Sequence, residues 1–170
     1  PMIIVTPDGF TSFYINGADG KLNYEDFFIK ELIPHIEKTY KVKAEKRFRG
    51  IAGLSMGGYG SLLYALKYPN LFAAAAPLSA AIWTPDQIKE MSKSQFDGYF
   101  INSIGKNLLG AERLTPTWLA NSPLGLIEKK TQEELSSVRY WIDCGDDDFL
   151  TIGNAQLHIA LTNKNVPHEF

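Results

Sequence analysis

The sequence Gly-Leu-Ser-Met-Gly at residues 53–57 constrains the fold more than any other feature of the chain. It follows a run that predicts a strand over 47–54 and precedes a run that predicts a helix over 57–68. A serine in a G-x-S-x-G sequence between strand and helix sits on a strained turn, with its Oγ clear of the sheet. We therefore expect Ser55 to be a nucleophile. The backbone N–H of Met56, at the helix N-terminus, should then be one donor to a developing oxyanion.

The G-x-S-x-G sequence around Ser55 could also arise by chance. Gly and Ser at ordinary frequencies produce G-x-S-x-G in a chain of this length about one time in twenty. The requirement for an apolar strand before the motif and a helix after it removes most of those accidents.

The rest of the chain alternates between strand and helix patterns. Further strands are expected over 2–6, 71–79 and 138–144 and from Val166 onward, and further helices over 23–40 and 150–163. This rhythm predicts a mostly parallel sheet with helices on both faces, and ligands at the carboxyl ends of its strands.

Residues 81–137 lack this rhythm, and short helices are expected around 85–96 and 99–109. We interpret 81–137 as a lid or cap inserted into a single domain that spans residues 1–170.

The expected helix over 23–40 carries three local signals. Asn23 and Asp26 have the spacing of a capping box, and Pro34 should kink the helix or start its second half. Apolar residues at helical spacing predict a buried stripe. They are Phe27, Phe28, Leu32, Ile33, Ile36 and Tyr40.

The candidate acid lies in the sequence Gly-Asp-Asp-Asp at residues 145–148, directly after an expected strand. A catalytic carboxylate is expected in such a loop, because the order along the chain in this kind of site is Ser, Asp or Glu, and then His. Spacing leaves Asp146, Asp147 and Asp148 open, and each could equally be a solvated carboxylate or a helix cap.

None of the three histidines suits the role of general base. His35 and His158 fall within expected helices, and His168 begins the last strand rather than following it. We therefore expect the base to lie beyond residue 170 in a longer protein. The apolar run over 2–6 is a poor exposed edge strand, so earlier partner strands and a second oxyanion donor are expected before it.

Composition narrows the classes of function. The net charge of −2, the pI near 5.9 and the scattered Lys and Arg residues argue against nucleic-acid binding. No apolar run reaches the roughly 20 residues that span a bilayer, so no membrane role is expected. The single cysteine, Cys144, leaves the compartment open. The chemistry expected of Ser55 needs no metal and no organic cofactor.

Residues 49–60, 4–9, 31–34 and 143–150 resemble the esterase D-like esterases. This family includes feruloyl and acetyl-xylan esterases, S-formylglutathione hydrolases, tributyrin esterases and mycolyltransferases. The resemblance implies an α/β-hydrolase fold, Ser55 as nucleophile and Asp148 as the acid of the triad. It also implies a histidine after residue 170 and an oxyanion loop before the first strand.

The function expected from this resemblance is that of a serine carboxylesterase acting on small-molecule or carbohydrate esters, of the acyl-sugar, feruloyl or acetyl-xylan type. Trp83 and Trp118 in the expected lid could bind substrate or simply pack the lid core. Three alternatives remain: an S-formylglutathione hydrolase, an acyltransferase of the mycolyltransferase type, and a non-catalytic carbohydrate-binding relative. The oligomeric state is left open.

Overall fold

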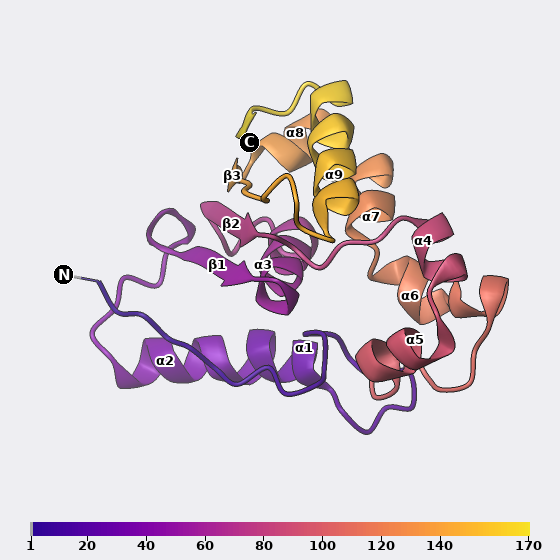
Figure 1. Cartoon of the computed structure of the whole chain (residues 1–170). Coiled ribbons are helices and arrows are strands. Elements are labelled where there is room, and N and C mark those ends of the chain that lie inside the picture. The colour runs from indigo at the N-terminus through magenta and orange to yellow at the C-terminus, as the bar shows by residue number, and fades with distance from the viewer. Residues whose placement is uncertain (1) are drawn as a thin grey trace.

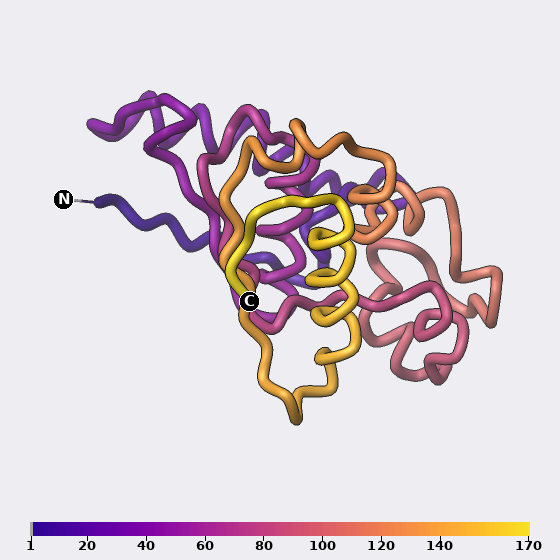
Figure 2. Tube along the Cα trace, turned by 90° about the horizontal axis from the view of Figure 1, so that it is seen from above, coloured from indigo at the N-terminus to yellow at the C-terminus, as the bar shows by residue number. Residues whose placement is uncertain are grey.

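A computed structural model describes residues 2–170, and its centre is a parallel four-stranded sheet (Figure 1). The strands are β1 (Gly50–Leu54), β2 (Ala74–Leu78), β3 (Arg139–Trp141) and β4 (His168–Glu169), in the order β1-β2-β3-β4. Figure 2 shows these four segments running side by side. The sheet and its helices confirm the expected α/β architecture.

The strands are shorter than the sequence pattern predicts. The first of them starts at Gly50, because Lys46–Phe48 form a 3₁₀ turn. Beyond β3, the chain pairs with β2 again only through an isolated bridge between Leu78 and Asp143.

One face of the sheet carries the core. Ile51 pairs in register with Ala75, and Ala75 with Tyr140, so these three side chains share a face. Helices α3 (Met56–Lys67), α7 (Pro123–Lys129) and α9 (Thr151–Asn163) pack on this face. Their buried contributions are Leu62, Ala65, Leu66, Ile127, Leu157 and Leu161.

The opposite face of the sheet is open among the described residues. Leu54 is 67% exposed and Trp141 is 60% exposed. The strands follow one another in a single direction across the sheet, and right-handed crossovers then place every connecting helix on the same side. Residues 2–170 therefore supply one helical layer, whereas the sequence pattern led us to expect two.

Residues 2–6 do not form the expected strand. Their backbone groups make no hydrogen bonds within residues 2–170, and Met2 and Ile4 are 81% and 73% exposed. A strand exists only where a neighbour completes its ladder, and no neighbour lies beside this segment in the described chain. The expected strand is therefore not formed among the described residues.

The first helical region begins at α1 (Tyr24–Asp26), continues through a π-helical segment (Phe27–Leu32) and ends as α2 (Ile33–Thr39). Pro34 lies in the first turn of α2, which confirms that it starts the second half of the helix. The apolar stripe is only partly buried, since Phe27 is 38% exposed and Tyr40 is 51% exposed.

The capping box expected from Asn23 and Asp26 does not form. The Asn23 amide donates to the carbonyl of Gly20 instead. The N–H of Asp26 donates to Oδ1 of Asn16, which lies ten residues earlier in the loop. The N–H of Asp26 is therefore capped by Asn16, which is distant in the sequence, and not by Asn23 as the spacing predicted.

Residues 81–137 fold as short helices (Figure 1). These are α4 (Pro85–Glu90), α5 (Lys93–Phe100), a 3₁₀ turn (Gly110–Arg113), α6 (Pro116–Ala120), α7 and α8 (Gln132–Ser136). The helix expected over 99–109 is absent. Helix α5 ends at Phe100, and the positive φ angles at Gly105 and Asn107 are incompatible with a continuous α-helix. That this whole segment is a lid remains a prediction. Within residues 2–170, every helix is too short or too polar to cross a bilayer.

Candidate active site

Ser55 occupies the turn between β1 and α3, with φ of +56° and ψ of −114°. Its N–H donates to the carbonyl of Leu78 at 2.9 Å. Its carbonyl accepts from the N–H groups of Tyr59 at 2.9 Å and Ala81 at 3.0 Å. Three hydrogen bonds therefore hold a sparsely populated backbone conformation in place, while the side chain stays exposed. This is the strand-turn-helix geometry that the sequence predicted.

Two glycines beside this turn show why the motif needs them. A Cβ added to Gly53 would lie 2.4 Å from the carbonyl carbon of Gly57. A Cβ added to Gly58 would lie 2.7 Å from the carbonyl oxygen of Leu78. The strand and helix can cross this closely only because neither position has a side chain.

Met56 is the first residue of α3. N–H groups in the first turn of a helix have no partner within the helix, and the helix dipole places partial positive charge there. A negatively charged oxygen next to Ser55 would meet this N–H. The N–H of Met56 is therefore suitably placed to stabilise an oxyanion, and this role remains a proposal.

Asp148 lies in the loop between β3 and α9 and is half-buried, whereas Asp146 and Asp147 are exposed. Its Oδ1 accepts from the N–H of Leu150 at 2.9 Å, so one oxygen forms an Asx turn directly before α9. The other oxygen makes no hydrogen bond within the described chain and is available to orient a base. The turn and the proposed triad role are thus compatible in one carboxylate.

Ser55 and Asp148 stand at the same end of the sheet. Ser55 follows β1 and Asp148 follows β3, and both strands pair with β2. The carboxyl ends of neighbouring parallel strands form one edge, where α/β proteins bind their ligands. The topology therefore brings together two residues that lie 93 positions apart in the sequence.

The histidines in the described chain make other contacts. Nδ1 of His158 and Nε2 of His168 are 2.8 Å apart, and Nδ1 of His168 lies 2.8 Å from the carbonyl oxygen of Val166. His35 is exposed on α2. Within residues 2–170, no histidine is hydrogen-bonded to Ser55.

A trough of about 1320 Å³ opens beside Ser55. It is bounded by residues 2–7, by the helices between Phe28 and Ile36 and by β1, and it continues across the open face of the sheet along β2, β3 and β4. Met56 and Tyr14 also line it. Tyr14 was not identified from the sequence, because it lies in a loop without a recognisable motif. Its position after a strand-like run was the one signal that could have placed it near the site.

Trp83 and Trp118 do not line this trough. They border a separate cavity of about 20 Å³ between α3 and the 81–137 segment, and Trp118 is 8% exposed. Trp83 stacks on Tyr99 with ring centroids 5.4 Å apart. These contacts favour packing within that segment, and substrate binding by either tryptophan stays a prediction.

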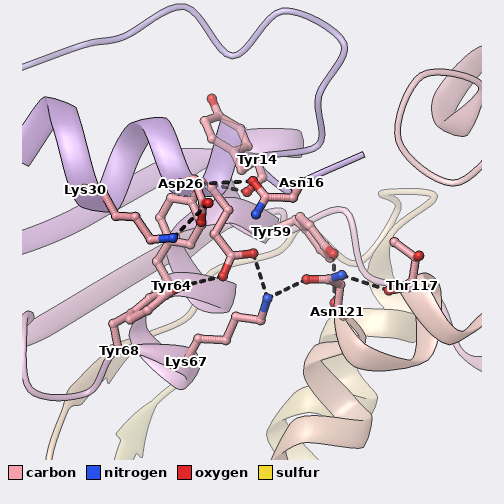
Figure 3. A network of polar contacts seen from close by, with 11 residues as sticks. Tyr14, Asn16, Asp26, Lys30, Tyr59, Tyr64, Lys67, Tyr68, Thr117 and Asn121 are labelled. Carbon is pink, nitrogen blue, oxygen red and sulfur yellow. Dashed lines mark hydrogen bonds and ion pairs between the residues drawn. The ribbon is translucent and has the colours of Figure 1, made fainter. Parts of the chain in front are cut away.

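Sequence reasoning also missed a buried polar network behind the nucleophile turn (Figure 3). Lys67 Nζ, in the last turn of α3, donates at 2.7 Å to Glu25 and at 2.7 Å to Asn121. The hydroxyl groups of Tyr68 and Tyr59 donate to the Glu25 carboxylate and to the Asn121 carbonyl. Burial, and then the hydrogen bond to the Glu25 carboxylate, raise the pKa of Tyr68 well above its ordinary value. The network connects α1, α3 and α6.

The parallel sheet, the strained serine at the carboxyl end of β1 and the carboxylate loop after β3 define an α/β-hydrolase fold with a serine-hydrolase nucleophile turn. The chain belongs to the esterase family whose model is described as "Putative esterase", which matches residues 2–169.

Relatives agree with this family. An esterase of Mycobacterium tuberculosis is 30% identical over 99% of this chain and 40% of its own length. A solved ferulic acid esterase is 32% identical, with a TM-score of 0.70 over 92% of this chain and 54% of its own. The Staphylococcus aureus fluorophosphonate-binding serine hydrolase FphF is 30% identical, with a TM-score of 0.76 over 96% of this chain and 60% of its own. The chain thus spans about half the length of these relatives.

Proposed function

We propose that this chain provides the nucleophile and the acid of a serine carboxylesterase that acts on acyl esters of small molecules or carbohydrates. The observation that carries the proposal is Ser55, held exposed at φ +56° at the N-terminus of α3. Membership of the esterase family supports the reaction class. The ferulic acid esterase supports a preference for feruloyl or acyl-sugar esters over thioesters.

The reaction proceeds in two steps. Ser55 Oγ forms a bond to the ester carbonyl carbon while its proton passes to a base. The bond to the alcohol then breaks, and the alcohol leaves with that proton. Water repeats the sequence on the acyl-enzyme, which releases the acid and restores Ser55. The N–H of Met56 stabilises the oxyanion, and Asp148 orients the base. No histidine within residues 2–170 contacts Ser55, so the base is not assigned to a residue.

Covalent labelling tests the nucleophile. A longer protein that contains this chain together with the base, its Ser55→Ala variant and a Ser94→Ala control are incubated with an aryl fluorophosphonate, and the modified peptide is identified by mass spectrometry. Ser94 is an exposed serine on α5, remote in sequence from the turn. We expect the label on Ser55 in the first and third proteins and none in the second. Absence of label on Ser55 under excess reagent contradicts the proposal.

The same assay distinguishes the three aspartates. We expect Asp148→Asn to slow phosphonylation of Ser55 by about 10³–10⁴-fold, as loss of the triad acid does elsewhere. Asp146→Asn and Asp147→Asn should change the rate by less than about three-fold, because exposed carboxylates are well screened. A larger loss from Asp147→Asn would move the acid to that residue.

Substrate class is read from relative rates of hydrolysis. We expect methyl ferulate and acetylated xylo-oligosaccharides to be cleaved at least about ten-fold faster than S-formylglutathione, a ratio that corresponds to about 1.4 kcal/mol of transition-state binding. The reverse order would favour a thioester hydrolase.

A further inference from the structure

The loop that carries Tyr14 has an unusual backbone. Phe10, Phe13 and Tyr14 have φ angles of +47°, +51° and +57°, although none of them is glycine. Positive φ is uncommon for such residues and is retained where the surrounding structure enforces it, often at functional sites.

Hydrogen bonds within and outside the loop enforce this conformation. The N–H of Tyr14 donates to Oγ of Ser12 at 2.9 Å, and that hydroxyl donates to the carbonyl of Gly9 at 2.6 Å. The carbonyl of Tyr14 accepts at 2.6 Å from the hydroxyl of Tyr64 on α3. The Tyr14 backbone is thereby fixed to the helix that follows the nucleophile.

The ring of Tyr14 lies against the first turns of α3. A Cβ added to Gly60 would lie 2.5 Å from this ring, and one added to Gly57 would lie 3.7 Å from the Tyr14 hydroxyl. The ring also packs edge-on against Tyr24, with centroids 5.3 Å apart. The side chain is therefore held on both sides and has little freedom to move.

The hydroxyl of Tyr14 takes no part in the contacts that hold the loop. It has no hydrogen-bond partner within residues 2–170, and Tyr14 lines the trough that also contains Ser55 and Met56. Burial and the nearby Asp8 raise the pKa of Tyr14, so the phenol stays protonated and can donate at neutral pH. The hydroxyl lies beside the turn that carries Ser55, because a Cβ added to Gly57 would be 3.7 Å from it, and a fixed donor there can bind an oxygen atom of a substrate.

We propose that Tyr14 is a substrate-binding residue whose hydroxyl donates a hydrogen bond to an oxygen atom of the ester held beside Ser55. The proposal rests on the esterase function proposed above for its choice of ligand. Tyr14 would favour esters whose acyl or alcohol part carries a further oxygen atom, because a purely aliphatic part leaves the phenol unpaired in the bound state.

Equilibrium binding tests the proposal without requiring catalysis. In a Ser55→Ala background, binding of intact methyl ferulate is followed by NMR with ¹³C at the tyrosine Cζ atoms. We expect binding to shift the Cζ resonance that Tyr14→Phe removes. The Tyr14→Phe change should raise Kd about five-fold, the value of one neutral hydrogen bond, with the unfolding midpoint nearly unchanged because the ring is retained.

The matched control is Tyr40→Phe in the same background. Tyr40 follows α2 and is 51% exposed, outside the trough lining. Its substitution should leave Kd unchanged. The Tyr14 proposal is overturned if methyl ferulate does not bind, if Tyr14→Phe leaves Kd unchanged, or if Tyr40→Phe raises Kd equally.

Failure of the two proposals can be told apart. Ser55 labelled by fluorophosphonate with Kd unaffected by Tyr14→Phe overturns only the role of Tyr14. Ser55 unlabelled with Kd raised by Tyr14→Phe overturns the esterase proposal and retains Tyr14 as an ester-binding residue.

Discussion

Nζ of Lys67 lies 2.7 Å from Oε2 of Glu25, and these two atoms join the last turn of α3 to α1. The Glu25 side chain is 9% exposed and that of Lys67 is 22% exposed, so water screens the pair weakly. The same ammonium reaches Asn121 at the end of α6 (Figure 3). One cation on the helix behind Ser55 therefore connects that helix to two segments that pack against it.

Removing this cation should destabilise the fold. Lys67→Met leaves the Glu25 carboxylate buried, with Tyr68 as its remaining hydrogen-bond donor. We expect the free energy of unfolding in urea to fall by about 2–3 kcal/mol. Lys30→Met is the matched control, because Lys30 is 67% exposed in its pair with Asp26 and should contribute less than about 1 kcal/mol. Equal losses in the two variants would contradict a special role for the buried pair.

Asn154 is a second buried polar residue with a testable role. Its amide donates to the carbonyl of Ala80 at 3.0 Å, and its Oδ1 accepts from the N–H of Ala80 at 3.2 Å. Asn154→Ala leaves the N–H of Ala80 unpaired in the interior, while the carbonyl of Ala80 keeps its bond from the N–H of Ile82, and this should cost about 1–3 kcal/mol. Asn163→Ala, at the exposed end of α9, should change the stability by less than about 0.5 kcal/mol. A small effect at Asn154 would show that water replaces the side chain there.

Gly58 tests the close crossing beside the nucleophile turn. A methyl group there would lie 2.7 Å from a backbone oxygen and 2.9 Å from a backbone Cα atom, neither of which can turn aside. We expect Gly58→Ala to reduce the unfolding free energy by about 1–3 kcal/mol. Gly98→Ala, within α5 and with nothing within 4 Å, should instead stabilise the chain by about 0.5–1 kcal/mol. Changes of opposite sign in the unfolding free energy of the two variants would support the close crossing at Gly58, and changes of the same sign would contradict it.

Alkaline pH should destabilise the fold through its buried tyrosines. Burial, with smaller effects of Tyr14 and Asp8, raises the pKa of Tyr24 to about 12, against about 10 in an unfolded chain. Below pH 10 the phenol is neutral in both states, and its contribution to stability is fully present. Between about pH 10 and 12 the unfolded chain loses the proton and the folded chain keeps it, so stability falls by about 1.4 kcal/mol per pH unit for this group.

Urea unfolding between pH 9 and 12 measures this dependence. Tyr24→Phe should make the slope shallower by about 1.4 kcal/mol per pH unit, because one differential proton is removed. An unchanged slope would assign the alkaline loss to other tyrosines, of which Tyr59, Tyr64 and Tyr140 also have pKa values raised chiefly by burial.

Parts of the candidate site could be predicted because they are local. The glycines and serine of residues 53–57 encode the turn through backbone sterics between near neighbours, and the structure shows that turn. The choice of Asp148 came from resemblance, since spacing left three aspartates open. The strand expected over 2–6 is not formed within residues 2–170, because apolar β-branched composition encodes a preference, whereas a ladder needs a neighbour.

The sequence by itself determined the parallel strand-helix plan and the position of Ser55, from which the reaction class is proposed. The tertiary structure decided the contacts between residues that are distant in the sequence. Tyr14 lies against α3, Glu25 pairs with Lys67 across 42 residues, and Trp118 packs away from the trough. The physical reason is the range of the interactions. Turn sterics and hydrophobic periodicity act within a few residues, whereas the energy of a distant pair depends on a packing arrangement that the whole chain must first form.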